Sequence, residues 1–310
     1  MKFIDLHCDT AGRIFYEKLS LKESICSVDI KKLKKGQSLA QVFAIFVDQE
    51  LNDNPYDEFL KIYNNFVNEV SKNSDDIEIV TNVKEMDGCR NNNKIGAFLS
   101  IEEGEVIKGN IELLKEVYRM GIRILTITWN YKNKLGYPNY LFKYQNEGLT
   151  DKGIEVINEC ENLGIIPDAS HLSDGGFYDL IKVCKKPFIA SHSNARAITN
   201  HPRNLSDEMI KLLANKGGVM GINFCSKFLG KAPISSIEEI IEHIKHIKHV
   251  GGIDILSLGS DFDGIINDVE INNASEFNKL YEALKKSNFT EDDIEKIFYK
   301  NVQRVFEETL

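Results

Sequence analysis

The sequence predicts an α/β fold, a (β/α)8 TIM barrel that ends in C-terminal closing helices. Two observations lead to this prediction. Short apolar runs alternate with longer amphipathic segments along the chain, and eight such runs are present. Runs rich in Ile, Val, Leu and Phe that are too short for helices are typical of parallel strands buried on both faces. Because barrels of this length form one domain, we expect a single domain over residues 1–310.

The expected strands and helices follow one another in regular order. Strands are expected at residues 3–6, 39–47, 95–101, 122–128, 165–169, 187–190, 218–223 and 253–258. Helices are expected at residues 57–70, 110–120, 151–163, 176–184, 207–216 and 236–250, and closing helices at residues 274–286 and 291–306. Gly121, Gly164 and Gly217 stand where helices should end. Thr150 and Thr290 stand where helices should begin.

The overall composition restricts the classes of function. The formal net charge is −9, whereas binding to nucleic acid or to anionic membranes needs a basic surface, so we expect neither partner. No run of about 18 apolar residues is present, and no membrane-spanning helix is expected. Asp5 and His7 come too early for a signal peptide, and six scattered cysteines without a CxxC pair favour reduced thiols. We therefore expect a cytoplasmic protein.

The tripeptide His7-Cys8-Asp9, at the end of the first expected strand, is the starting point for the functional prediction. Side chains alternate between the two faces of a strand. His7 and Asp9 should therefore point the same way, while Cys8 points into the core. An imidazole and a carboxylate side by side make half of a site for a divalent metal ion.

Polar residues also follow other expected strands, at the end of the barrel where active sites lie. Those able to bind a metal or move a proton are Glu102, His171, His192 and Asp261. One ion would take His7 and Asp9, the other would take His171 and His192, and Glu102 would bridge them. Two such ions would hold and deprotonate a shared water, which provides a nucleophile at neutral pH.

The order of these motifs resembles the membrane dipeptidase (renal dipeptidase) family of zinc metallopeptidases. The segments that carry the resemblance are Asp5-Leu6-His7-Cys8-Asp9, Ser100-Ile101-Glu102, Gly148-Leu149-Thr150, Asp168-Ala169-Ser170-His171, Ser191-His192-Ser193-Asn194-Ala195-Arg196, His201-Pro202-Arg203-Asn204-Leu205 and Gly259-Ser260-Asp261-Phe262-Asp263-Gly264. Each segment is a weak signal alone, but together and in the family's order they are strong. The resemblance implies a barrel of the metal-dependent hydrolase type that cleaves dipeptides.

The resemblance also implies roles for single residues. Five residues match the family's zinc ligands, namely His7, Asp9, Glu102, His171 and His192. The implied cofactors are two Zn²⁺ per chain, bridged by Glu102 and a hydroxide or water. Asp261 matches the catalytic acid/base residue. Arg203 matches the arginine that binds the C-terminal carboxylate of the substrate, a task that suits the guanidinium fork.

The chain departs from the mammalian members of this family in two respects. They have a His after the Thr of the fourth strand, where this chain has Trp129, whose only polar group is an indole N–H. Zinc would then carry the transition-state charge, aided by Asn130 or the loop after it as a substrate-binding element. The chain also lacks their signal peptide and anchor signal, so membrane attachment is not expected. A homodimer is implied by the family alone.

Other acidic residues compete for two of these roles. Glu103 and Glu105 compete with Glu102, but Glu102 directly follows the apolar strand, and we expect the other two in a solvated loop. Asp263 competes with Asp261 as the acid/base residue. Asp261 is favoured because it lies nearer the end of the strand. Asp263 would then contact the residues of the site without taking part in the reaction itself.

Basic residues offer alternatives as well. Arg196 competes with Arg203 for the substrate carboxylate, with Arg203 preferred. His243, His246 and His249 recur at every third position of an expected helix, which spreads them too widely for one metal ion. We expect these three side chains on a solvated helix face.

The sequence as a whole predicts a zinc dipeptidase that hydrolyses the peptide bond of dipeptides, among them dipeptides with a D-residue at the C-terminal position. One alternative is another metal-dependent amidohydrolase on the same barrel, acting on N-acyl amino acids or lactones. A second alternative is a metal-binding homologue that has lost catalysis, which the replacement at Trp129 would favour.

Overall fold

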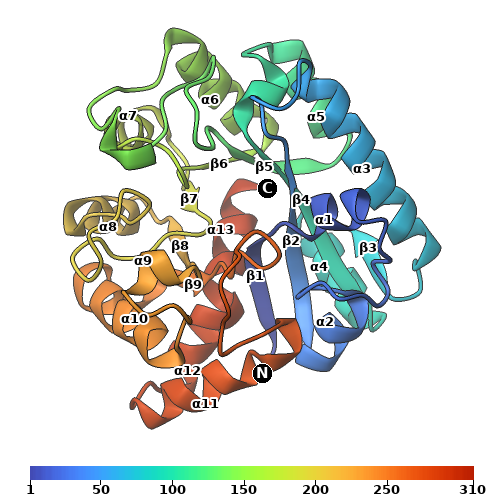
Figure 1. The fold of residues 1–310 in the computed structure, drawn as a ribbon, viewed down its shortest axis with the longest axis vertical. Coiled ribbons are helices and arrows are strands. Elements are labelled where there is room, and N and C mark those ends of the chain that lie inside the picture. Colours follow the sequence, from blue (N-terminus) through green and yellow to red (C-terminus); the bar gives the residue numbers. More distant parts are fainter.

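Eight parallel strands close into a barrel in the structure, a computed structural model that describes residues 1–310 (Figure 1). They are β1 (Phe3–Cys8), β2 (Ser38–Phe46), β4 (Ile95–Glu102), β5 (Ile122–Thr126), β6 (Ile166–Asp168), β7 (Ile189–Ala190), β8 (Val219–Ile222) and β9 (Leu256–Leu258). Their order around the barrel is β1-β2-β4-β5-β6-β7-β8-β9, and a β1–β9 pairing closes it. The predicted (β/α)8 barrel is confirmed.

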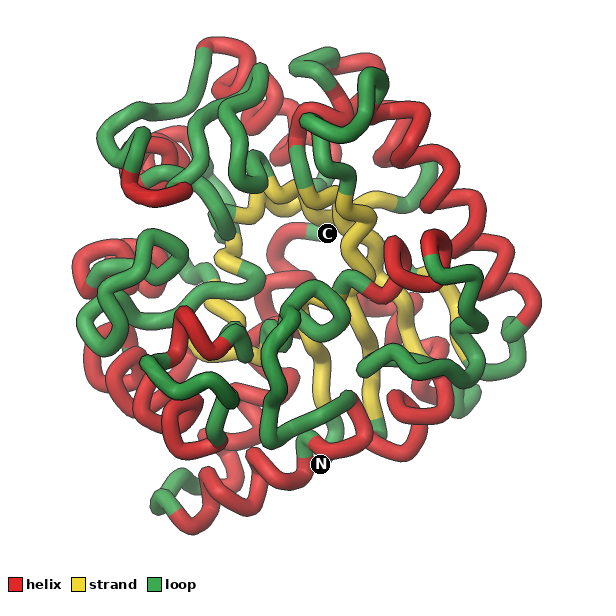
Figure 2. Tube along the Cα trace, viewed as in Figure 1, coloured by secondary structure: helices red, strands yellow, loops and turns green.

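Helices surround the strands (Figures 1 and 2). They are α1 (Thr10–Tyr16), α2 (Ile30–Gly36), α3 (Pro55–Lys72), α4 (Val83–Asn91), α5 (Ile111–Arg119), α6 (Asp151–Leu163), α7 (Asp174–Val183), α8 (Asp207–Asn215), α9 (Ser226–Leu229), α10 (Ile237–Gly251), α11 (Asn278–Lys286), α12 (Glu291–Glu295) and α13 (Asn301–Thr309). The side chains of Thr150 and Thr290 cap α6 and α12 as expected. No helix combines the length and the apolar character that a membrane crossing requires.

The structure contains elements that the sequence did not predict. A ninth strand, β3 (Ile77–Ile79), pairs with the beginning of β4 and lies outside the closed ring. Helices α1, α2, α4 and α9 are also additional, and each is at most nine residues long. Elements this short carry too few apolar positions for a periodic signal. The expected closing helix 291–306 is present, with a π-helical stretch, Lys296–Lys300, between α12 and α13.

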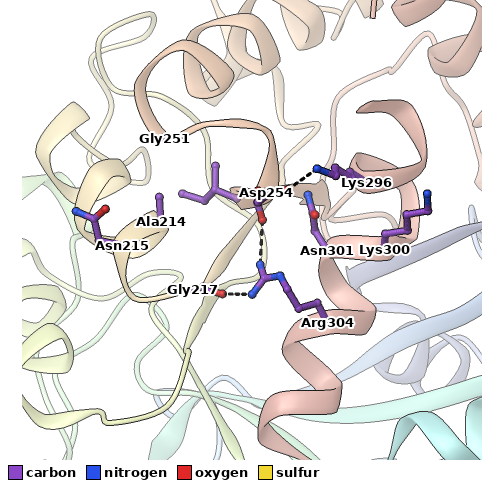
Figure 3. A pocket seen from close by; sticks show the side chains of 11 residues that line it. Ala214, Asn215, Gly217, Gly251, Asp254, Lys296, Lys300, Asn301 and Arg304 are labelled. Atoms are coloured by element: carbon purple, nitrogen blue, oxygen red, sulfur yellow. Dashed lines mark hydrogen bonds and ion pairs between the residues drawn. The ribbon is translucent and has the colours of Figure 1, made fainter. Parts of the chain in front are cut away.

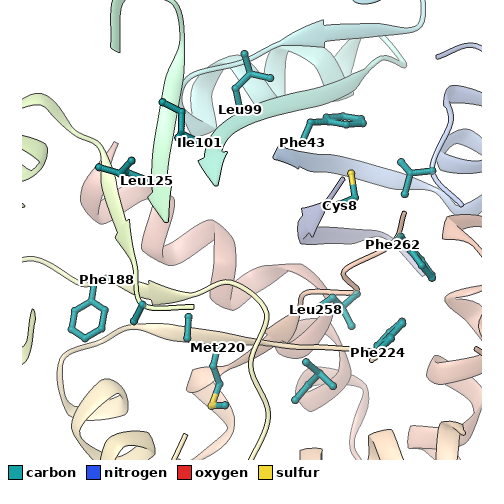
Figure 4. Close-up of a cluster of buried hydrophobic side chains, with 14 of the residues drawn as sticks. Cys8, Phe43, Leu99, Ile101, Leu125, Phe188, Met220, Phe224, Leu258 and Phe262 are labelled. Atoms are coloured by element: carbon teal, nitrogen blue, oxygen red, sulfur yellow. The ribbon is translucent and has the colours of Figure 1, made fainter. Parts of the chain in front are cut away.

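Alternating strand residues build two apolar layers. Residues such as Phe43, Leu99 and Leu125 belong to a cluster of 67 buried residues between the barrel and its helices (Figure 4). Their strand neighbours, among them Phe98, belong to a separate cluster of 17 buried residues that includes Phe306 of α13. The rings of Phe98 and Phe306 are 4.6 Å apart, so α13 closes one end of the barrel. The polar functional residues lie at the other end, where the strands finish.

Gly259 provides a test of how tightly the barrel closes. A Cβ atom at this position would lie 1.9 Å from the carbonyl oxygen of Ser191. We expect Gly259→Ala to lower the free energy of unfolding by about 3 kcal/mol, because the backbone contact cannot relax without moving a strand. Urea unfolding of the metal-free proteins measures this.

A glycine in open space serves as the control for that variant. A Cβ atom on Gly88 in α4 would meet nothing within 4 Å. Gly88→Ala should therefore raise the free energy of unfolding, by about 0.5–1 kcal/mol, because alanine favours helix. Equal stability of the two variants would contradict the close backbone approach at Gly259.

Candidate metal centre

The ends of the barrel strands bring the six predicted metal-binding and acid–base residues into one cluster. β1 supplies His7 and the adjoining Asp9, and β4 ends at Glu102. The loops after β6, β7 and β9 supply His171, His192 and Asp261. A cavity of about 830 Å³ opens above this cluster and is lined by Asp9, Glu102, His171, Arg203 and Asp261, among others.

Glu102 lies at the centre of this cluster because of strand alternation. Phe98, Ser100 and Glu102 share one face of β4, and Glu102 is its last residue. Its Oε2 lies 3.4 Å from Nε2 of His7, and its Oε1 lies 3.2 Å from Nε2 of His171 and 3.6 Å from Nε2 of His192. One carboxylate oxygen thus faces His7, and the other faces the two remaining imidazoles.

A second group of donors adjoins His7. Its Nε2 lies 3.4 Å from Oδ2 of Asp9 and 3.9 Å from Oδ1 of Asp261. His7, Asp9 and Asp261 can hold one ion, as can His7, Glu102 and His192. Asp261 therefore stands close enough to bind a metal itself, which the sequence did not indicate.

Contacts behind the imidazoles orient their Nε2 atoms toward Glu102. Nδ1 of His192 lies 2.7 Å from Oγ of Ser191, and that hydroxyl donates to Oδ2 of Asp168 at 2.5 Å. Nδ1 of His171 lies 3.3 Å from Oδ1 of Asn130. Such outer contacts fix the tautomer and orientation of metal-binding histidines. Asn130, which the sequence suggested as a substrate-binding residue, lines the cavity, and its amide oxygen lies beside a histidine of the cluster.

The donors fit a bound cation. Nε2 of His7 is buried and has no hydrogen-bond partner, although three carboxylates lie within 3.9 Å. Nε2 of His171 lies only 3.1 Å from Nε2 of His192. Two imidazole nitrogens and several carboxylates directed at the same space are a donor set that suits zinc.

Burial and neighbouring charges shift the pKa values of the cluster. Burial lowers the pKa of His171 to about 4, with a contribution from Arg203, and also lowers the pKa of His192. Both imidazoles are therefore neutral at pH 7, the form that binds metal. Burial, together with the charge of Glu102, raises the pKa of Asp9 to about 7. Burial opposes ionisation of Glu102, but His7 and His171 outweigh it and lower its pKa.

Asp261 is held at the edge of the cluster by Asn223, a residue that the sequence did not single out. Asn223 directly follows β8, is fully buried, and its Nδ2 donates to Oδ2 of Asp261 at 2.8 Å. Its Oδ1 accepts a hydrogen bond from the backbone N–H of Cys225. Burial raises the pKa of Asp261 above the ordinary value for an aspartate. In the sequence, the only sign of this contact is that an asparagine, Asn223, ends an apolar run.

Arg203 presents a buried guanidinium to the cavity. It is 5% exposed, and its Nη2 donates to the carbonyl oxygen of His192 at 3.3 Å. Its Nε and Nη1 have no hydrogen-bond partner. A buried cation without a counter-ion is costly, so the site suits an anionic group on a ligand. The competing Arg196 makes two hydrogen bonds of 2.7 Å to the carboxylate of Asp174 and is not free for a ligand.

The other competing residues have structural contacts. Asp263 accepts hydrogen bonds from Thr10 at 2.6 Å and from Arg13 at 2.9 Å, so it supports the loop after β9. The prediction of a solvated Glu103 is wrong, because this side chain is fully buried and accepts from the backbone N–H of Trp129 at 3.0 Å. A turn with a φ of 94° directs it away from the strand axis.

The prediction of a solvated His243 is also wrong. Its Nδ1 accepts from the backbone N–H of Ala195, its Nε2 lies 2.8 Å from the carbonyl oxygen of Leu229, and the side chain is fully buried. His246 pairs with Asp207 near the surface, as an exposed helix face allows. The spacing within the helix did not reveal that α9 packs over one edge of α10.

A second cavity, of about 470 Å³, lies beyond the opposite ends of β8 and β9 (Figure 3). Its cations are already paired. Arg304 donates to the carbonyl oxygens of Gly217 and Asp254, and Lys296 pairs with the Asp254 carboxylate at 2.9 Å. No histidine lines this second cavity, in contrast to the cavity above the metal centre.

Comparisons with known proteins agree with this geometry. The sequence profile of the membrane dipeptidase family, peptidase family M19, matches residues 1–310. An uncharacterised dipeptidase of Schizosaccharomyces pombe is 30% identical over 298 residues, which cover 91% of this chain and 72% of that protein. A crystal structure of a metallopeptidase from Rhodobacter sphaeroides, liganded with a phosphinate mimic of the dipeptide L-Ala-D-Ala, superposes with a TM-score of 0.92 at 22% identity and covers 100% of this chain and 99% of that one.

A second solved structure shares the fold over the same length. It is a metallopeptidase described as dipeptidase AC, with a TM-score of 0.93 and 22% identity, covering 100% of this chain and 98% of that one. At this identity the two superpositions show the barrel, whereas the profile match over the entire sequence shows the family. The chain belongs to the membrane dipeptidase family, peptidase family M19, and is a metallo-dipeptidase.

Proposed function

We propose that this enzyme is a binuclear zinc dipeptidase in which Glu102 bridges the two ions. His7 and Asp9 would hold one ion, and His171 and His192 the other. The observation that carries the proposal is the position of Glu102, whose two oxygens lie 3.2–3.6 Å from three imidazole nitrogens. When bound, the ions supply an activated water and polarise the scissile carbonyl group.

The protein's own residues position the substrate and move the proton. Arg203 binds the C-terminal carboxylate through its unpartnered Nε and Nη1, which restricts substrates to dipeptides and similar short acyl-amino acids. Asp261 takes the proton of the attacking water and delivers it to the departing amine. Asn223 holds one oxygen of Asp261, so the other faces the cluster. Asn130 orients His171 from the cavity wall.

A D-residue at the C-terminal position is part of the proposal. It is supported by the phosphinate mimic of the dipeptide L-Ala-D-Ala that is bound to the Rhodobacter sphaeroides metallopeptidase, whose barrel superposes on this one. A single domain, a homodimer and a cytoplasmic location stay predictions from the sequence and its resemblance.

Arg203→Met is expected to lower kcat/KM for dipeptides by about 10²–10³-fold, because a charged hydrogen-bonding pair is lost from a buried site. The measurement is hydrolysis of the four Ala-Ala stereoisomers, N-acetyl-D-alanine, N-acetyl-alaninamide and a lactone by zinc-loaded protein. We expect wild-type protein to have a higher kcat/KM for the free dipeptides than for the other substrates. Arg203→Met should reduce the difference in kcat/KM between substrates with a free carboxylate and the amide substrate.

Three outcomes would contradict the proposal in different ways. Turnover of lactones alone would indicate another amidohydrolase on the same barrel. Zinc binding without any hydrolysis would indicate a catalytically silent homologue. Equal turnover of the carboxylate and amide substrates by wild-type protein would show that Arg203 does not bind the substrate carboxylate.

A further inference from the structure

One wall of the cavity above the metal centre is aromatic, and the strand register fixes its position. Phe46 is the last residue of β2 and pairs with Glu102 in the β2–β4 register. Paired residues of neighbouring parallel strands point to the same face, so Phe46 stands beside Glu102 at the barrel mouth. Trp129 follows β5 on the other side of β4, and its ring centroid is 4.7 Å from that of Phe46. Both residues line the cavity.

This aromatic wall, Phe46 and Trp129, is supported from behind. The buried carboxyl group of Glu103 accepts hydrogen bonds from the backbone N–H of Trp129 at 3.0 Å and from Nδ2 of Asn133 at 2.5 Å. The ring of Tyr131 packs against Trp129 with a centroid distance of 5.6 Å. The loop that carries Trp129 is therefore fixed, and the wall is preformed rather than assembled by a ligand.

The aromatic wall and Arg203 lie on opposite sides of the metal centre. Phe46 and Trp129 flank β4, whereas Arg203 lies in the loop after β7 and packs over Phe228, which follows β8, with Cζ 5.4 Å from the ring centroid. In the closed ring of eight strands, β7 lies opposite β2, which carries Phe46, and β8 lies opposite β4. A dipeptide with its carboxylate on Arg203 and its scissile carbonyl at Glu102 therefore extends its N-terminal residue toward the aromatic wall.

The charges around the cavity favour an apolar side chain at this wall. Besides the acids of the metal cluster, the cavity is lined by Asp263 and Glu17, and both pair with Arg13, at 2.9 and 3.1 Å. Asp263 and Glu17 lie on the side of the cavity near β1 and β9. The acidic residues on that side also suit the ammonium group of the substrate. Lys227 lies next to β8, on the side of Arg203. A charged side chain at the aromatic wall would lose hydration without gaining a partner.

We propose that Phe46 and Trp129 form the subsite for the N-terminal side chain and that the preferred substrates are dipeptides with a large apolar, above all aromatic, N-terminal residue. This inference rests on the proposed function. Aromatic rings gain from edge and offset contacts in addition to the area they bury, so an N-terminal Phe should gain more than a Leu.

The test compares kcat/KM for Gly-Ala, Leu-Ala, Phe-Ala and Asp-Ala, with the C-terminal alanine in whichever configuration the wild type turns over faster. Wild-type protein should prefer Phe-Ala to Gly-Ala by at least about tenfold, and Asp-Ala should be the poorest of the four. The Phe/Gly ratio is kcat/KM for Phe-Ala divided by kcat/KM for Gly-Ala. Phe46→Ala should reduce this ratio about fivefold, and Phe46→Leu, which retains apolar volume, should reduce it less. Trp129→Phe should also reduce it.

Leu51→Ala is the matched control, because Leu51 is an apolar residue in the same loop after β2 but is 80% exposed and does not line the cavity. It should leave the Phe/Gly ratio unchanged. A wild-type ratio near one, or a ratio that Phe46→Ala does not alter, would overturn the subsite while hydrolysis of Gly-Ala upholds the dipeptidase. Failure to hydrolyse any of the four dipeptides would overturn the proposed function, and the substrate class with it.

Discussion

Glu102→Ala is expected to abolish dipeptide hydrolysis, with kcat/KM reduced by at least about 10⁴-fold. Glu102 is the one carboxylate that lies within 3.6 Å of all three imidazoles, so its removal should separate the two halves of the metal centre. The purified variant should therefore hold fewer than the two zinc equivalents proposed for the wild type. Metal analysis and activity on the same preparation measure both effects.

A chelator distinguishes loss of metal from loss of fold. Wild-type protein dialysed against a chelator should lose activity and regain it with zinc, whereas Glu102→Ala should not regain it. Glu105→Gln is the matched control, because Glu105 is acidic and close in sequence, but the one hydrogen bond of its side chain is with the backbone N–H of Lys134. A Glu102→Ala protein with full zinc content and wild-type activity would contradict the bridging role.

Asp261→Asn is expected to lower kcat by about 10²–10⁴-fold while KM for the dipeptide changes little, which is the range for loss of a general acid or base. Asparagine keeps the shape of the side chain but cannot take or deliver the proton. Asp261 lies 3.9 Å from His7, so the variant also tests whether this carboxylate is a metal ligand. Zinc content and steady-state kinetics together answer both questions.

Zinc content determines how the Asp261→Asn result is interpreted. An unchanged zinc content with a low kcat supports a role in proton transfer. Loss of one zinc equivalent would instead assign Asp261 to the metal centre together with His7 and Asp9. Asp263→Asn is the comparison, because Asp263 is held by Thr10 and Arg13, and its change should affect stability more than kcat.

The barrel and the position of its metal centre could be predicted because both follow from short-range patterns. Each apolar run ends in polar residues, and alternation along a strand decides which side chains share a face. For this reason His7, Asp9 and Glu102 could be selected from the chain before their distances were known. The carboxyl ends of parallel strands meet at one end of a barrel, so the residues after β6, β7 and β9 had to gather there.

The structure was needed where a residue acts through a partner far away in the chain. Glu103 and Glu105 look alike in sequence, yet a positive φ at Glu103 buries its carboxyl group under Trp129. The sequence also left Arg203 and Arg196 as alternatives. The deciding contact is Asp174, which lies 22 residues from Arg196 and neutralises it.

The sequence by itself thus determined the barrel, the family and the set of side chains at the strand ends, because periodicity and motif order are properties of neighbouring residues. Only the tertiary structure decided which cations are free, which acids are buried and what faces the substrate. Phe46 and Trp129 are 83 positions apart, and only the β2–β4–β5 register brings their rings within 4.7 Å of each other. Burial and pairing arise from packing between distant segments, which no local pattern records.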